Sequence, residues 1–596
     1  DEITAKRVDQ RWRALFLENE YLKCSVLPDI GGHLYSCTDK TNGVEMFYAN
    51  PSIKKALIGY RGAWAAFGIE FNFPVSHNWV SMSPVDFATV SHPDGSASVW
   101  VGNQDRVYGM QWRVELILRP GSSVLEQKVR LFNGSAVRHR FYWWNNAAVE
   151  VWDDTRIYYP QSLSASHGFA VVDTWPVNQA GLDLSVIKNH TQGPVSQFMH
   201  RSREPYMGVY HPKNSAGVVH FALQEQLPAK KLWAWGVDAD GLDWRKALSD
   251  NNSAYAEIQA GLFRNQETYA FLQPQETLEF SEWWIPVREI GGIARANLHA
   301  VVNFERGSAN RLGLNVTHEM KGARLLVTGG GRTILDERVD LTPAKVFTRE
   351  LAAAPSYTVK LTGSNGETYI EHTEGKYDMD GPEQEKPGPR APRRFAAPAS
   401  RAEGDFVEIG KDQELNGQLL EAWATYQQGL KRFAASFELS RSAGRLAVQL
   451  MRYKNAETLL GAAQQQISND VETHYYLGLA LAGLDRFNEA KVQWERALVF
   501  RSHRPAAAFQ LAKLAARRGD YAEALRKVRV ALLEAPQPVN AGWLEVVLLK
   551  RLGQQEQASL QLAKWSAADP TSSLLRLEAS QPNEPAGALH AHLGAD

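Results

Sequence analysis

The chain has 596 residues, with 65 Lys and Arg against 66 Asp and Glu, so its formal net charge is −1. This balance lacks the basic excess typical of nucleic-acid-binding proteins, and a composition of 44% apolar and 22% charged residues argues against a mostly disordered chain. No apolar run approaches the roughly 18 residues that span a bilayer, and two cysteines, Cys24 and Cys37, are too few for the disulfide framework of a small secreted domain.

Residues 1–300 predict one large domain built from β-strands. Short runs rich in β-branched and aromatic residues, such as 96–103, 111–118 and 140–152, alternate with clusters of Gly, Asn, Asp and Pro. So many strands in one unit favour a large sandwich of antiparallel sheets. Fourteen of the 18 Trp lie before residue 290. They either stack on sugar rings or fill a β core.

Two shorter segments follow. Residues 301–374 contain strand-like runs joined by Gly-rich turns, which predicts a small separate β module. Residues 375–404 are rich in Pro and charge and poor in large apolar residues, so we expect an extended linker. Neither segment contains a cluster of chemically reactive side chains.

Residues 405–590 predict helical repeats with a period of 34. The columns in register are Gly444, Gly478 and Ala512; Tyr453, Phe487 and Tyr521; Ala456, Ala490 and Ala524; and Ala463, Ala497 and Ala531. Small residues let paired helices approach, and the aromatic residue fills the space between hairpins. The pattern resembles a tetratricopeptide array, a helix-turn-helix solenoid that usually serves as an interaction surface.

Two strand-like segments carry candidate carboxylates. In residues 68–74, alternation places Glu70 and Asn72 on one face and Ile69, Phe71 and Phe73 on the other. An acid in an aromatic-rich strand is costly unless it is paired or lines a cleft. Glu70 is therefore either a catalytic or sugar-binding group, or part of an exposed face or structural salt bridge.

In residues 255–261, the same alternation places Tyr255, Glu257 and Gln259 on one face. A phenol, an acid and an amide in a row form a hydrogen-bonding strip suited to a polyol, and Asn265 and Gln266 add further amides. The alternative is a solvated strand face.

Paired aromatic and amide residues supply further candidates. In residues 143–146, Trp143 and Asn145 point one way, whereas Trp144 and Asn146 point the other, so only one pair can line a given cleft. His77 has polar neighbours and is a candidate for the same site.

Residues 233–244 contain Asp238, Asp240 and Asp243, but their spacing does not fit an EF-hand. We therefore expect a polar hairpin turn there, with Trp235 and Trp244 bordering a sugar site.

Several blocks of the first half resemble a known superfamily. Residues 25–48 (SVLPDIGGHLYSCTDKTNGVEMFY) resemble the opening hairpin of galactose mutarotase-like proteins, and residues 256–266 (AEIQAGLFRNQ) resemble their late segment, whose general-base glutamate falls on Glu257. The blocks GIEFNFP, NNAAVEV, EIQAG and PVREIGG resemble a bacterial domain family of unknown function within this superfamily, often followed by tetratricopeptide repeats. The resemblance covers about half the chain. It implies a β-supersandwich with a carbohydrate cleft on its concave face.

One departure from the superfamily pattern bears on the chemistry. Mutarotases place a catalytic His in the middle strand as general acid, whereas Asn145 or Asn146 stands there in this chain. An amide cannot cycle a proton, so mutarotation requires a substitute such as His77.

Three functions remain open from the sequence. The first is a glycoside hydrolase for polysaccharide degradation, in which one of Glu70 and Glu257 is the acid and the other the base or nucleophile. The second is an aldose 1-epimerase with Glu257 as base and His77 or a water as acid. The third is a non-catalytic carbohydrate-binding protein displayed on the repeats.

Partners and compartment are expectations of the same kind. We expect an oligosaccharide or glycoside substrate, no cofactor, no metal and no nucleic acid, and a protein partner or self-association through the repeats. Sugar processing favours a periplasmic or extracellular location, without excluding the cytoplasm. Cys24 and Cys37 form either a bridge across the first hairpin or two free thiols.

Overall fold

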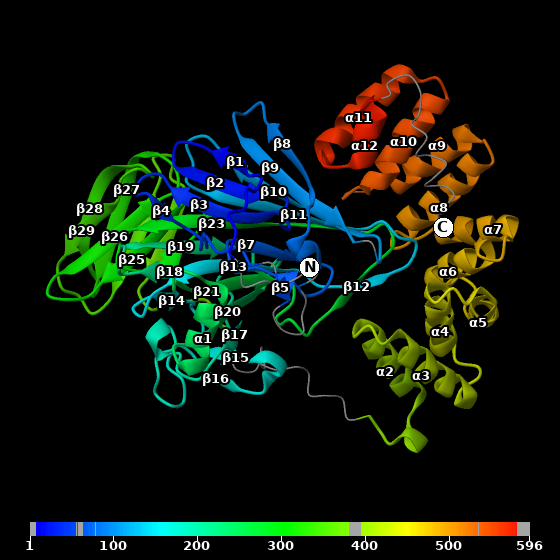
Figure 1. Ribbon diagram of the computed structural model, residues 1–596, viewed down its shortest axis with the longest axis horizontal. Coiled ribbons are helices and arrows are strands. Elements are labelled where there is room, and N and C mark those ends of the chain that lie inside the picture. Colours follow the sequence, from blue (N-terminus) through cyan, green and yellow to red (C-terminus); the bar gives the residue numbers. More distant parts are fainter. Residues whose placement is uncertain are drawn as a thin grey trace.

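A computed structural model describes residues 7–54, 56–57, 63–77, 79–105, 107–380, 395–534 and 536–580. Two large antiparallel sheets form the centre of the molecule, a small β module lies at one end, and the helices lie at the other (Figure 1). The predicted fold class, a β-sandwich followed by a small β module and a helical solenoid, is confirmed. Residues 381–394, in the middle of the expected linker, lie outside the described residues.

The larger sheet, called here the large sheet, has eleven strands. Its order is β1 (Leu15–Glu18), β2 (Leu22–Leu27), β3 (His33–Asp39), β7 (Ile69–Asn72), β13 (Trp144–Val151), β21 (Ala254–Gly261), β20 (Ala229–Ala234), β17 (Val195–His200), β15 (Leu163–Ala165) and β16 (Val172–Thr174), with β4 (Val44–Glu45) paired to β3. Cys24 and Cys37, opposite each other on β2 and β3, form a disulfide.

The second sheet has eight strands and packs on one face of the large sheet. Its order is β14 (Arg156–Tyr158), β18 (Tyr206–His211), β19 (Ala216–Phe221), β23 (Thr277–Arg288), β11 (Leu125–Asn133), β10 (Met110–Leu118), β9 (Ala97–Gln104) and β8 (Asp86–Ser91). Side chains such as Ile69 and Ile258 from the large sheet and Val129 and Trp284 from the second sheet share one apolar core. Because strand side chains alternate, the opposite face of the large sheet is free to carry polar groups.

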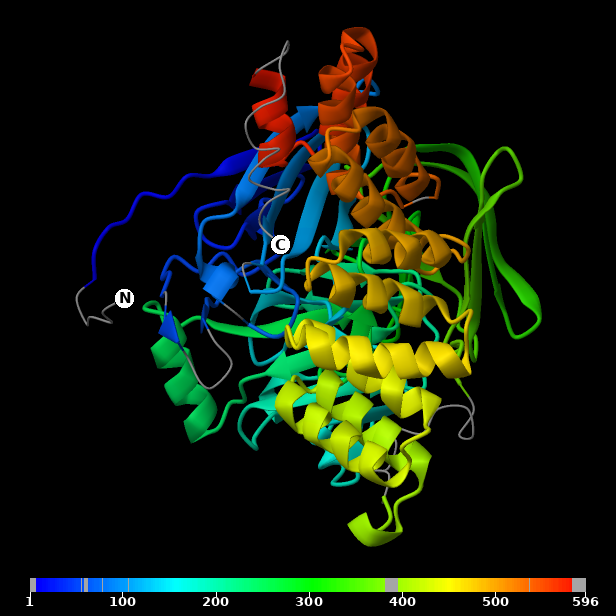
Figure 2. The same ribbon diagram turned by 90° about the vertical axis from the view of Figure 1, so that its right-hand side faces the viewer.

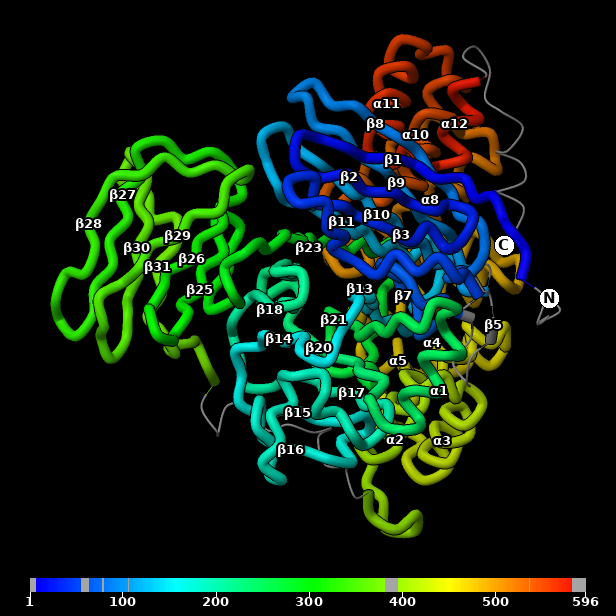
Figure 3. The backbone as a smooth tube through the Cα atoms, turned by 60° about the vertical axis from the view of Figure 1, so that its left-hand side comes forward, coloured from blue at the N-terminus to red at the C-terminus, as the bar shows by residue number. Residues whose placement is uncertain are grey.

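The small β module is a sandwich of two four-stranded sheets with its own apolar core. One sheet contains β24 (Arg295–Ala296), β25 (Ala300–Glu305), β26 (Asn310–Val316) and β29 (Phe347–Leu351), and the other contains β28 (Arg332–Leu341), β27 (Met320–Gly329), β30 (Tyr357–Thr362) and β31 (Thr368–Thr373). Figure 3 shows this module to one side of the two large sheets.

The C-terminal region is a stack of helical hairpins. It contains α2 (Glu403–Leu415), α3 (Leu419–Arg432), α4 (Phe437–Gln449), α5 (Tyr453–Gln466), α6 (Val471–Ala482), α7 (Phe487–Ala497), α8 (Arg504–Arg517), α9 (Tyr521–Ala531), α10 (Val539–Arg551), α11 (Gln555–Ala568) and α12 (Ser573–Ser580). The repeat glycines have a packing reason, because a Cβ at Gly444 would overlap Leu460 and one at Gly478 would overlap Trp494. Within the described part of the chain, no helix has the length and apolar character needed to cross a membrane.

The helical stack curves around the sheets and contacts them at both ends (Figure 2). Near its start, Glu414 accepts hydrogen bonds from Arg138 and Arg445, each at 2.9 Å. Near its end, Arg113 donates to Asp569 at 3.2 Å. These ion pairs are buried. The inner surface of the repeats is therefore in contact with the protein's own β-domain.

One local prediction was wrong. Residues 239–248 form a helix, α1 (Ala239–Leu248), instead of the expected hairpin turn. The Asp238 carboxylate accepts a hydrogen bond from the Gly241 backbone N–H and so caps the helix. An isolated helix of ten residues is marginal in water, and α1 is supported by packing of its buried Leu248 beside Tyr255.

Candidate functional site

The register of the large sheet aligns polar side chains across four neighbouring strands. Glu70 on β7 lies opposite Asn146 on β13, Asn146 lies opposite Gln259 on β21, and Gln259 lies opposite Lys231 on β20. Paired residues in antiparallel strands point to the same side, and this row faces away from the core between the sheets. The core side carries the alternating neighbours, such as Ile69 and Ile258. The row forms the floor of the candidate site.

Glu70 is buried beneath His77 and is held by three donor side chains. The Nδ1 atom of His77 lies 3.0 Å from Oε1 and 2.8 Å from Oε2 of Glu70. Asn146 and Asn72 donate to Oε2 at 3.0 and 3.3 Å. The Glu70 side chain is only 5% exposed, whereas that of His77 is 23% exposed. His77, and not Glu70, is therefore the group that can meet a substrate.

This arrangement separates the charges of the pair. Burial alone would raise the pKa of Glu70, but the charge and hydrogen bond of His77, with a contribution from His33, lower it to about 2. Burial alone would lower the pKa of His77, but the Glu70 carboxylate outweighs burial and raises that pKa above 6.5. The mutual attraction of the pair thus favours a Glu70 carboxylate beside a His77 imidazolium. A carboxyl group with so low a pKa favours the role of base, nucleophile or positioning residue for Glu70 over that of general acid.

Glu257 lies on β21 and is partly exposed. Tyr255 donates to its Oε1 at 3.3 Å, and Gln259 donates to its Oε2. Burial is the largest influence on the Glu257 carboxyl, and together with the negative charge of Glu70 it outweighs the positive charges of Lys231 and His77, so the pKa of Glu257 is raised above 4.5. Glu257 also helps to raise the pKa of His77. The two groups therefore lie within electrostatic reach of each other.

A set of six aromatic side chains, called here the aromatic wall, borders these polar groups. Its members are Tyr48, Trp64, Trp233, Trp235, Trp244 and Tyr255. Trp64 stacks on Trp235 with ring centroids 5.8 Å apart and lies 6.0 Å from the ring of His77. Trp235 also contacts Trp244 at 4.8 Å and Tyr255 at 6.0 Å. Tyr48, Trp64 and Tyr255 are buried, so Trp233, Trp235 and Trp244 are the members of the wall that are partly exposed.

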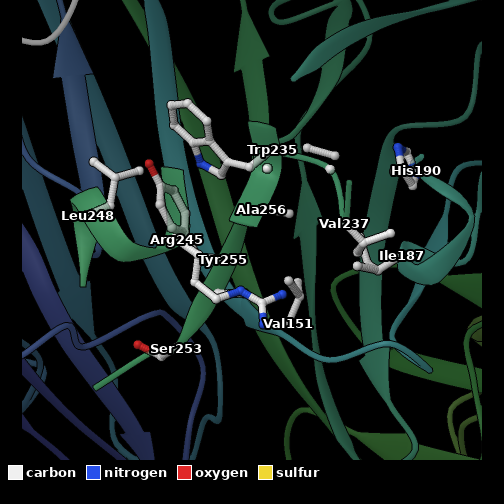
Figure 4. Close-up of a pocket in the computed structure, with 14 residues that line it drawn as sticks. Val151, Ile187, His190, Trp235, Val237, Arg245, Leu248, Ser253, Tyr255 and Ala256 are labelled. Carbon is white, nitrogen blue, oxygen red and sulfur yellow. The ribbon is translucent and has the colours of Figure 1, made fainter. Parts of the chain in front are cut away.

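A pocket beside the wall has a different lining. Trp235 directly follows β20 and Tyr255 lies on β21. Figure 4 shows Leu248, Tyr255 and Trp235 at one end of the pocket and His190 at the other. It contains neither Glu70, His77 nor Glu257. The pocket is therefore an extension of the wall and not the place where the acid and base groups meet.

Most of the residues predicted for the site come together. Glu70, Asn72, His77, Asn146 and Gln259 share hydrogen bonds or register on the floor, with Tyr255 and Glu257. Trp235 and Trp244 belong to the wall. The Oδ1 atoms of Asn72 and Asn146 have no hydrogen-bond partner among the described residues. Buried polar atoms of this kind call for an explanation, and a water or a ligand hydroxyl satisfies them.

Two predicted residues point the wrong way, and a third has a structural role. Trp143 and Asn145 are fully buried on the core side and donate to Glu282 of β23, because alternation on β13 sends them away from Asn146. They are no longer candidates for substrate contact. Asn265 uses its Oδ1 to accept from the Glu267 N–H and the Thr268 hydroxyl, so it shapes the turn that carries Gln266.

Sequence reasoning missed two members of the cluster, Trp64 and Lys231, whereas Gln266 was expected to add an amide beside Asn265. Lys231 is buried, and its Nζ donates to Gln266 at 3.0 Å and lies over the rings of Phe198 and Trp233. Lys231, Trp233 and Trp235 alternate along and just after β20, and this spacing could have predicted that Lys231 faces the same side as the two Trp. Among the described residues, no group of three or more His, Cys, Asp or Glu side chains could hold a metal ion.

Comparison with known proteins gives two family matches. Residues 1–287 match the family described as a domain of unknown function, DUF5107, and residues 295–372 match the second domain of YphG-like proteins. Among solved structures, a TPR-domain-containing protein from Parabacteroides distasonis is 19% identical, with a TM-score of 0.45, and the match covers 93% of this chain and 89% of that one.

Two further solved structures match the first half of the chain. A galactose mutarotase-like protein from Clostridium acetobutylicum is 13% identical, with a TM-score of 0.34, over 46% of this chain and 96% of that one. A galactose mutarotase related enzyme from Lactobacillus acidophilus is 12% identical, with a TM-score of 0.33, over 46% and 97%. The strand order and the contacts described above, and not these scores, carry the functional reasoning.

Proposed function

We propose that this chain, whose residues 1–287 match the DUF5107 family, is a carbohydrate-active enzyme of the aldose 1-epimerase type, with His77 as acid and Glu257 as base. The observation that carries the proposal is the position of His77. It is held at Nδ1 by the buried Glu70 carboxylate, lies in electrostatic reach of Glu257, and sits beside the aromatic wall. Glu70 is a positioning residue that keeps the imidazole oriented and protonated.

The proposed reaction opens and recloses a sugar ring. Glu257 takes the proton of the anomeric hydroxyl, the C1–O5 bond breaks, and O5 receives a proton from Nε2 of His77. The product is the open-chain aldehyde. Rotation about the C1–C2 bond and the reverse proton transfers close the ring as the other anomer. No bond to the protein forms, and the proton count is restored when the ring closes.

Polarimetry on freshly dissolved aldoses tests this proposal. We expect the protein to accelerate the change of rotation over buffer, and we expect His77→Gln and Glu257→Gln each to reduce the rate by about 10²–10⁴-fold, the usual contribution of a general acid or base. If no aldose of a panel changes its rotation faster than in buffer, at sugar concentrations that saturate the protein, the proposed epimerase activity is contradicted. Binding without turnover that survives both substitutions identifies a non-catalytic sugar-binding protein instead.

Glycoside hydrolysis is a second candidate, because the two carboxyl groups have opposite pKa shifts, raised for Glu257 and lowered for Glu70. Such divergence is the pattern of an acid and its ionised partner. Their strands, β21 and β7, are separated by β13, so the backbones are about 10 Å apart. The reaction requires Glu70 to be released from His77. Release of nitrophenol from chromogenic glycosides, lost in Glu70→Gln, supports this candidate over the first.

Location and partners complete the proposal. The Cys24–Cys37 disulfide supports an oxidising compartment, the periplasm or the exterior, where such bonds persist. The repeats use their inner surface on the β-domain, so we propose that a partner protein or a second copy binds elsewhere on them. Val499, Phe500 and Leu533 are exposed apolar side chains beyond the ends of α7 and α9. Light scattering of the full chain and of the Phe500→Ser variant tests self-association at this surface. A monomer mass for the unaltered full chain contradicts self-association there.

A further inference from the structure

We propose that Lys231 is a positioning residue for Glu257, acting through a chain of hydrogen bonds that passes along Gln266 and Gln259. This inference deepens the proposed function, since it assigns the residues that orient and charge the catalytic base. None of the three residues needs to touch the reacting atoms of the sugar.

The chain is continuous and has a fixed direction. Lys231 Nζ donates to Gln266 Oε1 at 3.0 Å, Gln266 Nε2 donates to Gln259 Oε1 at 3.1 Å, and Gln259 Nε2 donates to Glu257 Oε2. An ammonium group has only donors, so the first amide must turn its oxygen to Lys231 and its nitrogen to the second amide. The second amide must then present its nitrogen to Glu257. A single cation thereby sets the orientation of both amides.

The backbone holds each member of the chain in place. Gln259 on β21 lies opposite Lys231 on β20. Glu257 lies opposite Trp233, two residues away in the same antiparallel pair of strands. Gln266 follows β21 in the turn that Asn265 ties together through its Oδ1. Lys231 is buried, and its Nζ is 5.2 Å from the ring centroid of Phe198 and 5.5 Å from that of Trp233. A buried cation of this kind is costly unless it serves anionic or polar partners.

The consequence falls on one oxygen of the base. Oε2 of Glu257 accepts from Gln259, whereas among the described residues the one hydrogen bond to Oε1 is a longer one from Tyr255, at 3.3 Å. Oε1 is therefore the oxygen that takes the proton of the anomeric hydroxyl. The proton moves from the hydroxyl oxygen to Oε1, and the amide chain neither gains nor loses a proton.

The charged groups around Glu257 oppose one another. Burial and Glu70 favour its protonated form, and Lys231 on β20 and His77 after β7 favour the carboxylate. Tyr255 on the same strand contributes a hydroxyl that is neutral near pH 7, because burial raises its pKa well above 10. Burial raises the pKa of Glu257 and the charge of Lys231 lowers it. Removing Lys231 therefore raises the pKa of Glu257, so that a smaller fraction of this carboxyl is ionised near neutral pH.

Carbon-detected NMR titration of the full-length protein tests the inference without any substrate. The probe is the Glu257 carboxyl carbon in protein labelled at Glu, with its signal assigned from the Glu257→Gln variant. We expect Lys231→Met to raise the pKa of Glu257 by about 1. We expect Gln266→Met, which breaks the chain but keeps the cation, to raise it less. The expected companion change is a fall in kcat of about tenfold with little change in KM, strongest on the acidic side of the pH profile.

Lys230→Met is the matched control. Lys230 precedes Lys231 on β20 but points to the core side, and its Nζ has no hydrogen-bond partner among the described residues. This variant removes a neighbouring buried amine, whose pKa burial lowers to about 7, and we expect it to leave the Glu257 titration unchanged.

An unchanged Glu257 titration in both folded variants overturns the inference, as does an equal change in Lys230→Met. Because the titration needs no turnover, it stands even if no sugar is converted. Failure of the proposed reaction and failure of the hydrogen-bond chain are thus separate results.

Discussion

Removing the charge of Glu70 should convert His77 from a cation into a neutral imidazole. In Glu70→Gln, the amide oxygen can still accept from Asn72 and Asn146, which both donate to Oε2 of the carboxylate. The amide nitrogen then faces Nδ1 of His77. A nitrogen that donates at this position requires Nδ1 to accept, which is the arrangement of a neutral ring with its proton on Nε2.

The magnitude follows from the pKa of Glu70. Its fall from an ordinary 4.5 to about 2 corresponds to roughly 3 kcal/mol, at about 1.4 kcal/mol for each factor of ten. The attraction that lowers the pKa of Glu70 also raises the pKa of His77, because the two protonation equilibria are coupled. Without the carboxylate, burial and the charge of Lys231 lower the pKa of His77, against a smaller opposing influence from Glu257. The pKa of His77 should then fall below its ordinary 6.5.

The assay is a titration of the His77 ring nitrogens by NMR, alongside the pH profile of sugar turnover. Activity needs His77 protonated, so the alkaline limb of the profile should move to lower pH in Glu70→Gln, and the rate at pH 7 should fall by about 10²-fold or more. Glu115→Gln, in the more open pair with His92, is the control and should leave His77 unchanged. A His77 pKa that stays above 6.5 in Glu70→Gln refutes the reasoning.

Three other changes have expected outcomes. Burial raises the pKa of Glu282 to about 8, so the native state holds a proton that the unfolded chain releases, and the free energy of unfolding should decline from about pH 5 to pH 8. Urea denaturation of Glu282→Gln should show a free energy of unfolding that depends less on pH. The same dependence on pH in the variant and the unaltered protein contradicts this. Trp235→Ala removes a central ring of the aromatic wall, so calorimetry should show sugar affinity weakened by about tenfold, whereas equal affinity argues against contact. Glu414→Gln leaves the buried Arg138 and Arg445 without their shared carboxylate, which should destabilise the protein by about 3–5 kcal/mol; an unchanged melting temperature contradicts that value.

Patterns of short range were enough to predict much of the architecture. The 34-residue spacing of Gly444 and Gly478 predicted paired helices, and both glycines lie where a side chain would overlap the neighbouring helix. Strand alternation grouped Tyr255, Glu257 and Gln259, which share hydrogen bonds in the structure. These inferences need only the period of a helix or strand, which is local.

The remaining features depend on contacts between distant segments. Alternation separated Asn145 from Asn146 but could not tell which faced the second sheet, because that depends on strand pairing. The pairing of His77 with Glu70 depends on the path of the chain after β7, where the carbonyl of Pro74 accepts from the Tyr142 N–H at 2.7 Å. Lysine is usually an exposed residue type, and only the place of Lys231 in the sheet shows that it is buried.

Saturation-transfer NMR between the two anomeric proton signals of an aldose tests the central claim most directly, since it measures ring opening and closing at equilibrium. The account predicts that the protein accelerates this exchange and that His77→Gln and Glu257→Gln abolish the acceleration while sugar binding persists. Exchange at the buffer rate for every aldose that binds, or full acceleration in either variant, would contradict the account.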